Sequence, residues 1–366
     1  MSIDADRALQ ILADLGGLPA VSFHEGLVSD YVKRAVAGLG LDVKTDQYGN
    51  IIVRVQGTVA GVPPIAFMAH MDHPGFEAVE VREGALVAEA RGGVPPVSLT
   101  EPADIEIVER SGARRKGRLG GPAGAPEERR VLVHTDDAAS VPLPATVVFD
   151  LVDFERRDDL LHMRAADDLA GCGAILSALH GIMASPVEGD VYGVFTRAEE
   201  VGLIGARLMA QEHSLPRDCL IVSLESSREL PGAVQGAGPV IRVGDATFTF
   251  SAEAEQALHV ARRSLVEREP DTRVQRQLMS GGTCEASGFA AFGYATTGIA
   301  FPLGNYHNAT PEGGIGAEYI HADDYLTGVR LVEEAARSVR LRRTSPAWTR
   351  LAAVPAGPQA RLRQPA

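Results

Sequence analysis

The feature that most constrains this chain is a change of sequence periodicity near the middle of its 366 residues. Before residue 75 and after residue 161, apolar residues at helical spacing alternate with short apolar strands, a pattern typical of an α/β sheet. Between residues 76 and 161 helical spacing is nearly absent, and short alternating runs are separated by Gly-containing turns. Such a stretch indicates a small all-β barrel or sandwich inserted into an α/β domain.

The insertion divides the chain into three predicted parts. We expect residues 1–74 and 162–343 to form one discontinuous α/β domain, and residues 75–161 to form a barrel-like domain. Within the insertion, residues 111–130 are rich in Gly, Pro, Arg and Glu and are predicted to form a long exposed loop. Residues 344–366 are rich in Pro, Ala and Arg, and we expect a poorly ordered tail with Trp348 as its one anchor.

The overall charge limits the classes of partner. A formal net charge of −13 argues against nucleic acid or an anionic membrane as a main partner. The three cysteines are odd in number and far apart, so they indicate neither a disulfide framework nor a zinc–thiolate cluster. The N-terminus is acidic and amphipathic, unlike a signal peptide, and no apolar run reaches membrane-spanning length. We therefore expect a cytoplasmic protein.

Two helices are predicted before the first strand of the sheet. Asp4 is placed to cap a helix in which Leu9, Leu12 and Leu15 share one face. Residues 22–25, Ser-Phe-His-Glu, have the pattern of a capping box and are expected to open a second helix.

Ionisable residues stand at the ends of four predicted strands, which cover residues 65–69, 191–196, 220–224 and 295–300. In strand order these residues are His70 and Asp72, Glu199 and Glu200, Glu225, and His307. Taken singly, a histidine or carboxylate at a strand end is usually solvated. Taken together they point to a site, because the carboxyl ends of parallel strands meet at one edge of a sheet.

The pair Asp167-Asp168 extends this set. Asp168 is placed to cap a helix, which leaves Asp167 free to act as a ligand just before it. Histidine and carboxylate ligands without cysteine suit Zn²⁺, Co²⁺ or Mn²⁺. A carboxylate that bridges two such ions is the usual arrangement of a two-metal hydrolase.

Five short motifs, in their order along the chain, resemble the glutamyl aminopeptidase family. These are the tetrahedral (TET) aminopeptidases, in the MH clan of co-catalytic di-zinc peptidases. The motifs are His70-x-Asp72, Asp167-Asp168 before a Gly-containing helix, Glu199-Glu200-Val201-Gly202-Leu203-x-Gly205-Ala206, Gly281-Gly282-Thr283, and Tyr306-His307. The resemblance extends over nearly the whole chain to about residue 340 and includes the β insertion.

The resemblance implies a role for each residue of the predicted site. His70, Asp167 and Glu225 would hold one metal ion, and Asp167, Glu200 and His307 would hold the other. Asp167 would bridge the two ions, which are expected to be zinc, with cobalt or manganese as alternatives. Glu199 would be the general base that activates a metal-bound water, and Asp72 the partner of His70.

The resemblance also implies the fold and the assembly. The expected fold is a mixed-sheet zinc-exopeptidase domain of the phosphorylase/hydrolase-like type, with the β insertion as a small barrel-like domain. In the family the insertion mediates dimer contacts and cage-like assembly, so a homo-oligomer is expected.

Three residues depart from the pattern of the family. His73 follows His70-x-Asp72 where the family usually has Glu, and Cys284 follows the Gly-Gly-Thr motif where Asp is usual. Glu225 stands where the aminopeptidases of the family usually have Asp, and it has one methylene more. His321, just before a predicted helix, is a rival to His307 as a ligand.

We predict an exopeptidase that releases N-terminal residues from short peptides. The alternative is a carboxypeptidase or N-acyl amino acid deacylase with the same two-metal centre, which Glu225 and Cys284 favour. A glycosidase is disfavoured, because the adjacent residues Glu199 and Glu200 can hardly flank one bond at the required separation of roughly 5–9 Å. A non-catalytic assembly protein is the fourth hypothesis, under which Glu199→Gln would have no effect on function.

Overall fold

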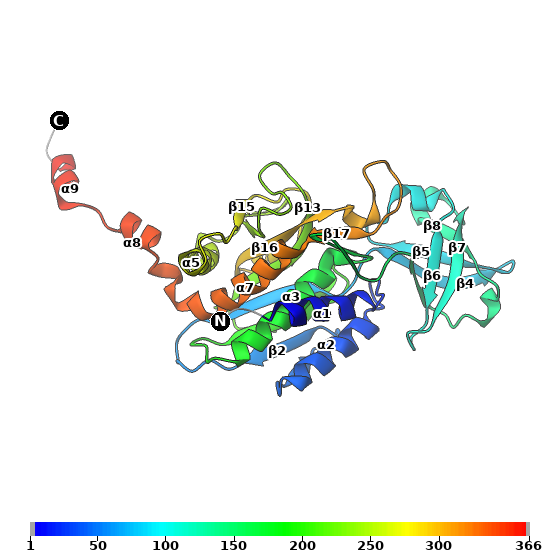
Figure 1. Ribbon diagram of the computed structural model, residues 1–366, viewed down its shortest axis with the longest axis horizontal. Coiled ribbons are helices and arrows are strands. Elements are labelled where there is room, and N and C mark those ends of the chain that lie inside the picture. Colours follow the sequence, from blue (N-terminus) through cyan, green and yellow to red (C-terminus); the bar gives the residue numbers. More distant parts are fainter. Residues whose placement is uncertain (1–3, 364–366) are drawn as a thin grey trace.

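The computed structural model describes residues 4–363 of the chain. It contains one large α/β part and a small β-barrel that lies to one side of it (Figure 1). The two ends of the barrel segment return to the large part, as expected for an insertion. The predicted fold class, a mixed α/β sheet with a separate small barrel, is therefore confirmed.

The large part is organised around an 11-stranded sheet with the order β1-β2-β12-β3-β13-β16-β17-β11-β10, in which β14 also pairs with β16, and β15 pairs with β14. The central strands β12, β3, β13 and β16 are mutually parallel. The strands are β1 (Val43–Thr45), β2 (Ile51–Val55), β3 (Ile65–His70), β10 (Glu155–Arg157), β11 (Leu160–Met163), β12 (Val191–Thr196), β13 (Leu220–Arg228), β14 (Val240–Arg242), β15 (Gln275–Gln277), β16 (Ala295–Gly304) and β17 (Glu318–His321).

Helices cover both faces of this sheet. Every residue of β3 is buried, as is usual for a strand in the middle of a parallel sheet. Its side chains alternate, so Phe67 joins the core beneath α1, α2, α3, α5 and α7, and Met68 joins the core beneath α4 and α6. The helices are α1 (Ala5–Gly16), α2 (Gly26–Gly38), α3 (Ala166–Met183), α4 (Ile204–Gln211), α5 (Ala252–Arg268), α6 (Glu285–Ala290) and α7 (Ala322–Ser338).

The barrel is a closed antiparallel sheet with the order β4-β5-β8-β7-β6-β9. Its core is separate from those of the main sheet and includes Phe76 and Phe149, whose rings pack edge to face. The strands are β4 (Gly75–Arg82), β5 (Ala85–Arg91), β6 (Asp104–Val108), β7 (Arg114–Pro122), β8 (Arg130–His134) and β9 (Ala145–Phe149). Closure leaves the barrel with no free strand edge.

The prediction of a long loop over residues 111–130 is wrong. Residues 114–122 form β7, which pairs with β6 and β8 and closes the barrel. The many Gly and Arg residues of this segment do not form the apolar pattern of a strand. Only Leu119 and Gly121 of β7 are buried, and its other residues are exposed or half-buried.

The strand pairing also bears on where the insertion ends. Residues 155–157 and 160–163 form β10 and β11, which pair with each other, and β11 also pairs with β17 in the main sheet. The predicted domain boundaries at residues 74 and 161 stay a prediction. On the strand pairing we propose that the inserted unit ends near residue 150, just after β9.

The C-terminal tail contains more regular structure than the sequence suggested. Residues 346–352 and 356–362 form the short helices α8 (Pro346–Ala352) and α9 (Ala356–Leu362), which contain no buried residue. Both project away from the body of the molecule (Figure 1). Trp348 is 36% exposed, so it is a weak anchor. Residues 364–366, also assigned to the tail, lie outside the described part of the chain.

Among residues 4–363, no helix is both long enough and apolar enough to cross a membrane.

Candidate active site

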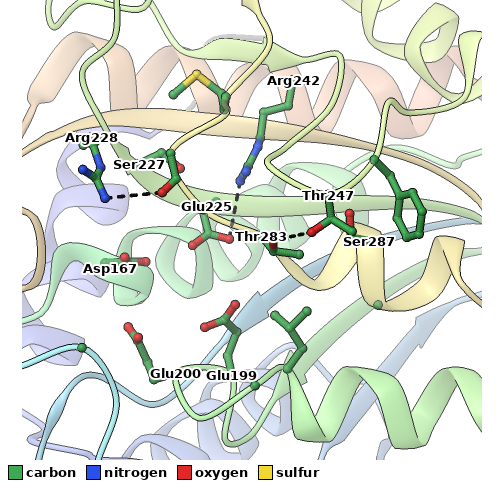
Figure 2. Close-up of a pocket in the computed structure, with 18 of the residues that line it drawn as sticks. Asp167, Glu199, Glu200, Glu225, Ser227, Arg228, Arg242, Thr247, Thr283 and Ser287 are labelled. Carbon is green, nitrogen blue, oxygen red and sulfur yellow. Dashed lines mark hydrogen bonds and ion pairs between the residues drawn. The ribbon is translucent and has the colours of Figure 1, made fainter.

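The parallel strands bring the predicted site residues to one edge of the main sheet. His70 is the last residue of β3, and Glu199 and Glu200 follow β12. Glu225 lies within β13 opposite Ala300, not after its end, because β13 continues to Arg228. It nevertheless reaches the same region, where Figure 2 shows it above Glu199 and beside Asp167. Convergence at this edge, expected from the sequence, is what the parallel pairing produces.

Asp167 lies between two histidines. One carboxylate oxygen, Oδ1, is 3.3 Å from Nε2 of His70, and the other, Oδ2, is 3.7 Å from Nε2 of His307. Nε2 of His70 is also 3.8 Å from Oε1 of Glu225, and Nε2 of His307 is 3.4 Å from Oε2 of Glu200. The side chains thus form two groups that share Asp167.

Two sets of three ligand atoms lie close enough together to hold a metal ion. One set comes from His70, Asp167 and Glu200, and the other from His70, Glu199 and Glu225, with all atoms of a set within 4.8 Å of one another. The second set contains Glu199, which the sequence assigned to proton transfer. The geometry alone therefore permits either role for Glu199.

The loop after β12 holds the two glutamates apart. Ala198 adopts a positive φ of 54°, a conformation that L-residues with a side chain rarely take and that points to a backbone fixed for function. Figure 2 shows Glu199 and Glu200 reaching into the pocket from the same loop. Glu199 lies on the side of His70, with Oε2 4.0 Å from Nε2, while Glu200 lies on the side of His307.

The carboxylate of Asp72 fixes this loop. Oδ1 accepts a hydrogen bond from the backbone N–H of Glu199 (3.0 Å), and Oδ2 accepts one from Glu200 (3.2 Å) and one from the hydroxyl of Ser22 (2.6 Å). Nδ1 of His70 lies 3.0 Å from the backbone oxygen of Asp72 and 3.6 Å from its carboxylate. Asp72 therefore holds the backbone of both glutamates as well as approaching His70.

The predicted capping box is wrong in detail. Helix α2 begins at Gly26 without a side-chain cap, and Ser22 bonds to Asp72 instead. Glu25 is fully buried, and Oε1 accepts hydrogen bonds from the backbone N–H groups of Phe23 and Ala198. The local pattern could not predict this, because Asp72 and Ala198 are distant in the sequence from Ser22 and Glu25.

The carboxylates in this cluster oppose one another's ionisation. Burial raises the pKa of Asp167 to about 7, with Glu225 adding to the rise and His70 opposing it. Burial and neighbouring carboxylates also raise the pKa values of Glu199 and Glu200 well above their usual range. Burial would lower the pKa of His70, but the carboxylates around it, Glu199 first, raise it well above its usual value. The cluster carries more negative charge than its own cations balance.

Several buried atoms of the cluster have no hydrogen-bond partner within residues 4–363. They are Nε2 of His70, Oδ1 of Asp167, Oε1 of Glu200 and Oε2 of Glu225. Buried polar atoms are almost always paired, so unpaired ones at one place indicate a missing partner. Nitrogen and carboxylate oxygen donors with excess negative charge fit divalent Zn²⁺, Co²⁺ or Mn²⁺. The residues present therefore fit a metal centre.

The barrel contributes to the same site through the turn after β5. Nδ1 of His307 lies 3.2 Å from the backbone oxygen of Gly93. A Cβ at Gly93 would come within 2.4 Å of that Nδ1, so the close approach requires glycine. His307 itself has a positive φ of 55°. Its burial, with His73 nearby, lowers its pKa to about 3, which favours the neutral imidazole that a metal ligand requires.

His73, one of the departures from the family pattern, contacts the backbone of Asp167. The ring is buried, with Nδ1 2.7 Å from the backbone oxygen of Asp167 and Nε2 2.9 Å from Oδ1 of Asn308. Burial lowers the pKa of His73 to about 4, and its hydrogen bonds to Asn308 and to the backbone of Asp167 oppose this shift. Its position connects the first turn of α3 to the loop that carries His307.

Two buried glutamates were missed by sequence reasoning. Glu318 on β17 accepts hydrogen bonds from the backbone N–H groups of Asp167 (2.9 Å) and His307 (2.8 Å). Glu285 accepts hydrogen bonds from the hydroxyls of Thr196 (2.9 Å) and Ser223 (2.8 Å) behind the site. No local pattern marks Glu318. For Glu285, the sequence feature that could have identified it is its position two residues after the Gly281-Gly282-Thr283 motif.

Two other sequence candidates lie outside the cluster. His321 precedes α7, where its Nδ1 accepts the N–H of Asp323, and it is not among the residues that line the site. Cys284 is buried beside Asp245, with Sγ 3.6 Å from Oδ2. Burial raises the pKa of the Cys284 thiol, so it is not poised to act as a nucleophile.

A pocket of about 640 Å³ opens beside the cluster. The carboxylates of Asp167, Glu199 and Glu200 line one end of it. The remaining wall is formed largely by Arg228, Arg242, Thr247, Phe248, Met279 and Thr283. Its size suits one or two amino-acid residues of a substrate beside a reactive centre.

Comparison with known proteins gives one family match. The profile of the M42 glutamyl aminopeptidase family matches residues 134–331, more than half of the chain. The matched region contains Asp167, Glu199, Glu200, Glu225 and His307.

Several solved structures share the fold of the whole chain. The dodecamer PhTET1-12s has 25% sequence identity and a TM-score of 0.75, and the match covers 90% of this chain and 98% of that one. The Pyrococcus horikoshii TET1 peptidase, described as assembling into a tetrahedron or a large octahedral shell, has 24% identity and a TM-score of 0.74, with 90% and 99% covered. An aminopeptidase from the archaeon Desulfurococcus kamchatkensis has 23% identity and a TM-score of 0.75, with 91% and 95% covered.

Proposed function

The chain belongs to the M42 glutamyl aminopeptidase family, and on that premise we propose that it removes N-terminal residues from peptides at a two-metal centre with Glu199 as general base. The observation that carries the proposal is the pair of side-chain groups that share Asp167. Its two carboxylate oxygens face different histidines, as a bridging ligand would.

The proposed ligands divide into two groups around Asp167. His70, Asp167 and Glu225 would hold one ion, and Asp167, Glu200 and His307 the other. When bound, the two ions would polarise the scissile carbonyl, stabilise the oxyanion and lower the pKa of water. Zinc is the proposed metal, with cobalt or manganese as alternatives, because the donors are histidine and carboxylate without cysteine.

Glu199 is the group proposed to move the proton. Its buried carboxylate stands beside the ligands, and its backbone N–H is held by Asp72. It would accept a proton from the attacking water and deliver it to the amine of the leaving peptide.

We propose a homo-oligomer that uses the barrel as its contact, supported by the large assemblies described for the two TET1 structures. A purified protein that sediments as a monomer would contradict this. The cytoplasmic location expected from the sequence stays a prediction.

A substrate panel tests the proposed function. The purified full-length protein is assayed against aminoacyl anilides and against N-acyl amino acids, and its metal content is measured by elemental analysis. We expect two metal ions per chain, turnover of the anilides, loss of that turnover after chelation, and its recovery when Zn²⁺, Co²⁺ or Mn²⁺ is returned. Turnover of N-acyl amino acids alone would show a deacylase or carboxypeptidase instead. A substitution at Glu225 to Asp would then be the first variant to examine.

A further inference from the structure

Arg242 is a buried cation at the back of the site. It is the last residue of β14, its exposed fraction is 1%, and its side chain points toward Glu225 in Figure 2. Neither Nε nor Nη1 has a hydrogen-bond partner among the described residues. An arginine side chain stays charged in proteins, and a buried charge without a partner is strongly unfavourable. This placement therefore requires an acceptor close by.

Glu225 is the acceptor that remains free for it. Nη1 of Arg242 lies 3.5 Å from Oε2 of Glu225, and that oxygen is itself unpaired. The other nearby carboxylates already have donors. Asp245 accepts from the backbone N–H groups of residues 247, 248 and 284 and from Ser287, and Glu285 accepts from two hydroxyls. The unpaired guanidinium and the unpaired oxygen thus face each other.

The two oxygens of Glu225 face different neighbours. Oε1 lies 3.8 Å from Nε2 of His70, on the side where the metal is proposed, whereas Oε2 lies toward Arg242. A carboxylate can bind a metal ion through one oxygen or through both. A glutamate side chain also has several rotatable bonds, so its orientation must be fixed by a neighbour.

We propose that Arg242 is a positioning residue that holds Oε2 of Glu225 and so leaves only Oε1 for the metal ion. The inference rests on the proposed two-metal function, because it concerns one of the proposed ligands. Arg242 acts through Glu225, and it balances part of the negative charge of the cluster. It also sets how many oxygen atoms Glu225 offers to the metal ion proposed between His70, Asp167 and Glu225.

Metal affinity and coordination are the direct readouts. Arg242→Met keeps most of the side-chain length and removes the charge and the donors. We expect it to weaken metal binding by about 10–100-fold, the usual effect of losing a partner of a ligand. Affinity is measured by competition with a chelator, and the visible absorption spectrum of the Co²⁺-loaded protein reports the coordination number. We expect that spectrum to change as Oε2 becomes free to bind.

A double-mutant cycle separates this role from a general structural one. In the Glu225→Gln background, the effect of Arg242→Met on metal affinity should largely disappear, because the two residues act as a pair. Arg342→Met is the matched control. Arg342 is also a buried arginine paired to one glutamate, with Nε 2.6 Å from Oε1 of Glu253 on α5. The control variant Arg342→Met should change neither the metal affinity nor the Co²⁺ spectrum.

The outcomes decide the proposal. Unchanged or tighter metal binding in Arg242→Met, or an effect of equal size in the Glu225→Gln background, would overturn it. If Arg242→Met does not fold, Arg242→Lys keeps the charge with a single donor group and should lower the affinity by a smaller factor. A wild-type protein that binds no metal overturns this inference and the proposed function together. A wild-type protein that binds metal and cleaves anilides, with no change in the arginine variant, overturns the inference alone.

Discussion

Buried charged side chains form one cluster at the carboxyl edge of the main sheet and another at the junction between that sheet and the barrel. At the junction, Glu106 on β6 accepts from Arg114 (3.0 Å), Lys116 (3.0 Å) and Arg164 (3.4 Å). Asp153 accepts from the same two arginines. Each carboxylate there has a cation, and the network is complete within the chain.

At the carboxyl edge of the main sheet, the carboxylates outnumber the cations that could pair with them. Several carboxylates surround His70, Arg242 faces only one of them, and several of their buried atoms have no partner in residues 4–363. Buried charges are tolerated only when they are paired or bind a metal. The junction therefore has the charge pattern of a structural network, whereas the sheet edge has that of a site completed by cations from outside the chain.

The largest expected effect is on turnover, at the sheet edge. Glu199→Gln removes the proposed base while keeping its shape, so kcat should fall by about 10²–10⁴-fold. Metal content, measured by elemental analysis, should stay the same. Glu267→Gln, on an exposed part of α5, is the control and should be silent. If Glu199→Gln loses metal, Glu199 is itself a metal ligand, a role that its closeness to His70 and Glu225 permits.

An intermediate effect is expected at the junction. Arg114→Met leaves Glu106 and Asp153 with fewer donors and also removes a hydrogen bond to the backbone oxygen of Gly17 (2.7 Å). The free energy of unfolding should fall by about 2 kcal/mol, since Arg114 is partly exposed and Arg164 remains. This is measured by denaturant unfolding. Turnover and metal content should not change, and a change in either would show that the two clusters are coupled.

The smallest effect tests a paired carboxylate outside both clusters. Burial would raise the pKa of Glu255, but its hydrogen bonds to His259 and Arg276 outweigh burial and lower the pKa from 4.5 to about 2. Because the folded-state pKa is lowered, the stability it contributes is present above about pH 4.5 and is lost as the pH falls toward 2.

Glu255→Gln should therefore lower the free energy of unfolding by about 1 kcal/mol at pH 7, after allowance for screening by solvent. The difference between the variant and the wild type should shrink at pH 3.5, measured by denaturant unfolding at both values. A difference that grows on acidification would mean that the ion pair is not the source of the stability.

Much of the fold was predictable from the sequence because it depends on local patterns. The apolar run before His70 and the run before Glu199 gave strands that match β3 and β12 within one residue. The absence of helical periodicity predicted the barrel, and the parallel strands brought His70, Glu199 and Glu225 to one edge, as expected. The exception within the barrel, β7, lacked a continuous apolar pattern.

Strand periodicity is set by neighbouring residues, so local patterns were enough to show which ionisable residues stand at the strand ends. The pairing of those side chains depends on the folded chain. Asp72 holds the backbone of Glu199, Glu318 holds Asp167, and Arg242 faces Oε2 of Glu225. These partners come from segments far apart in the chain. Their pairing follows from sheet register and side-chain direction, which no local pattern specifies.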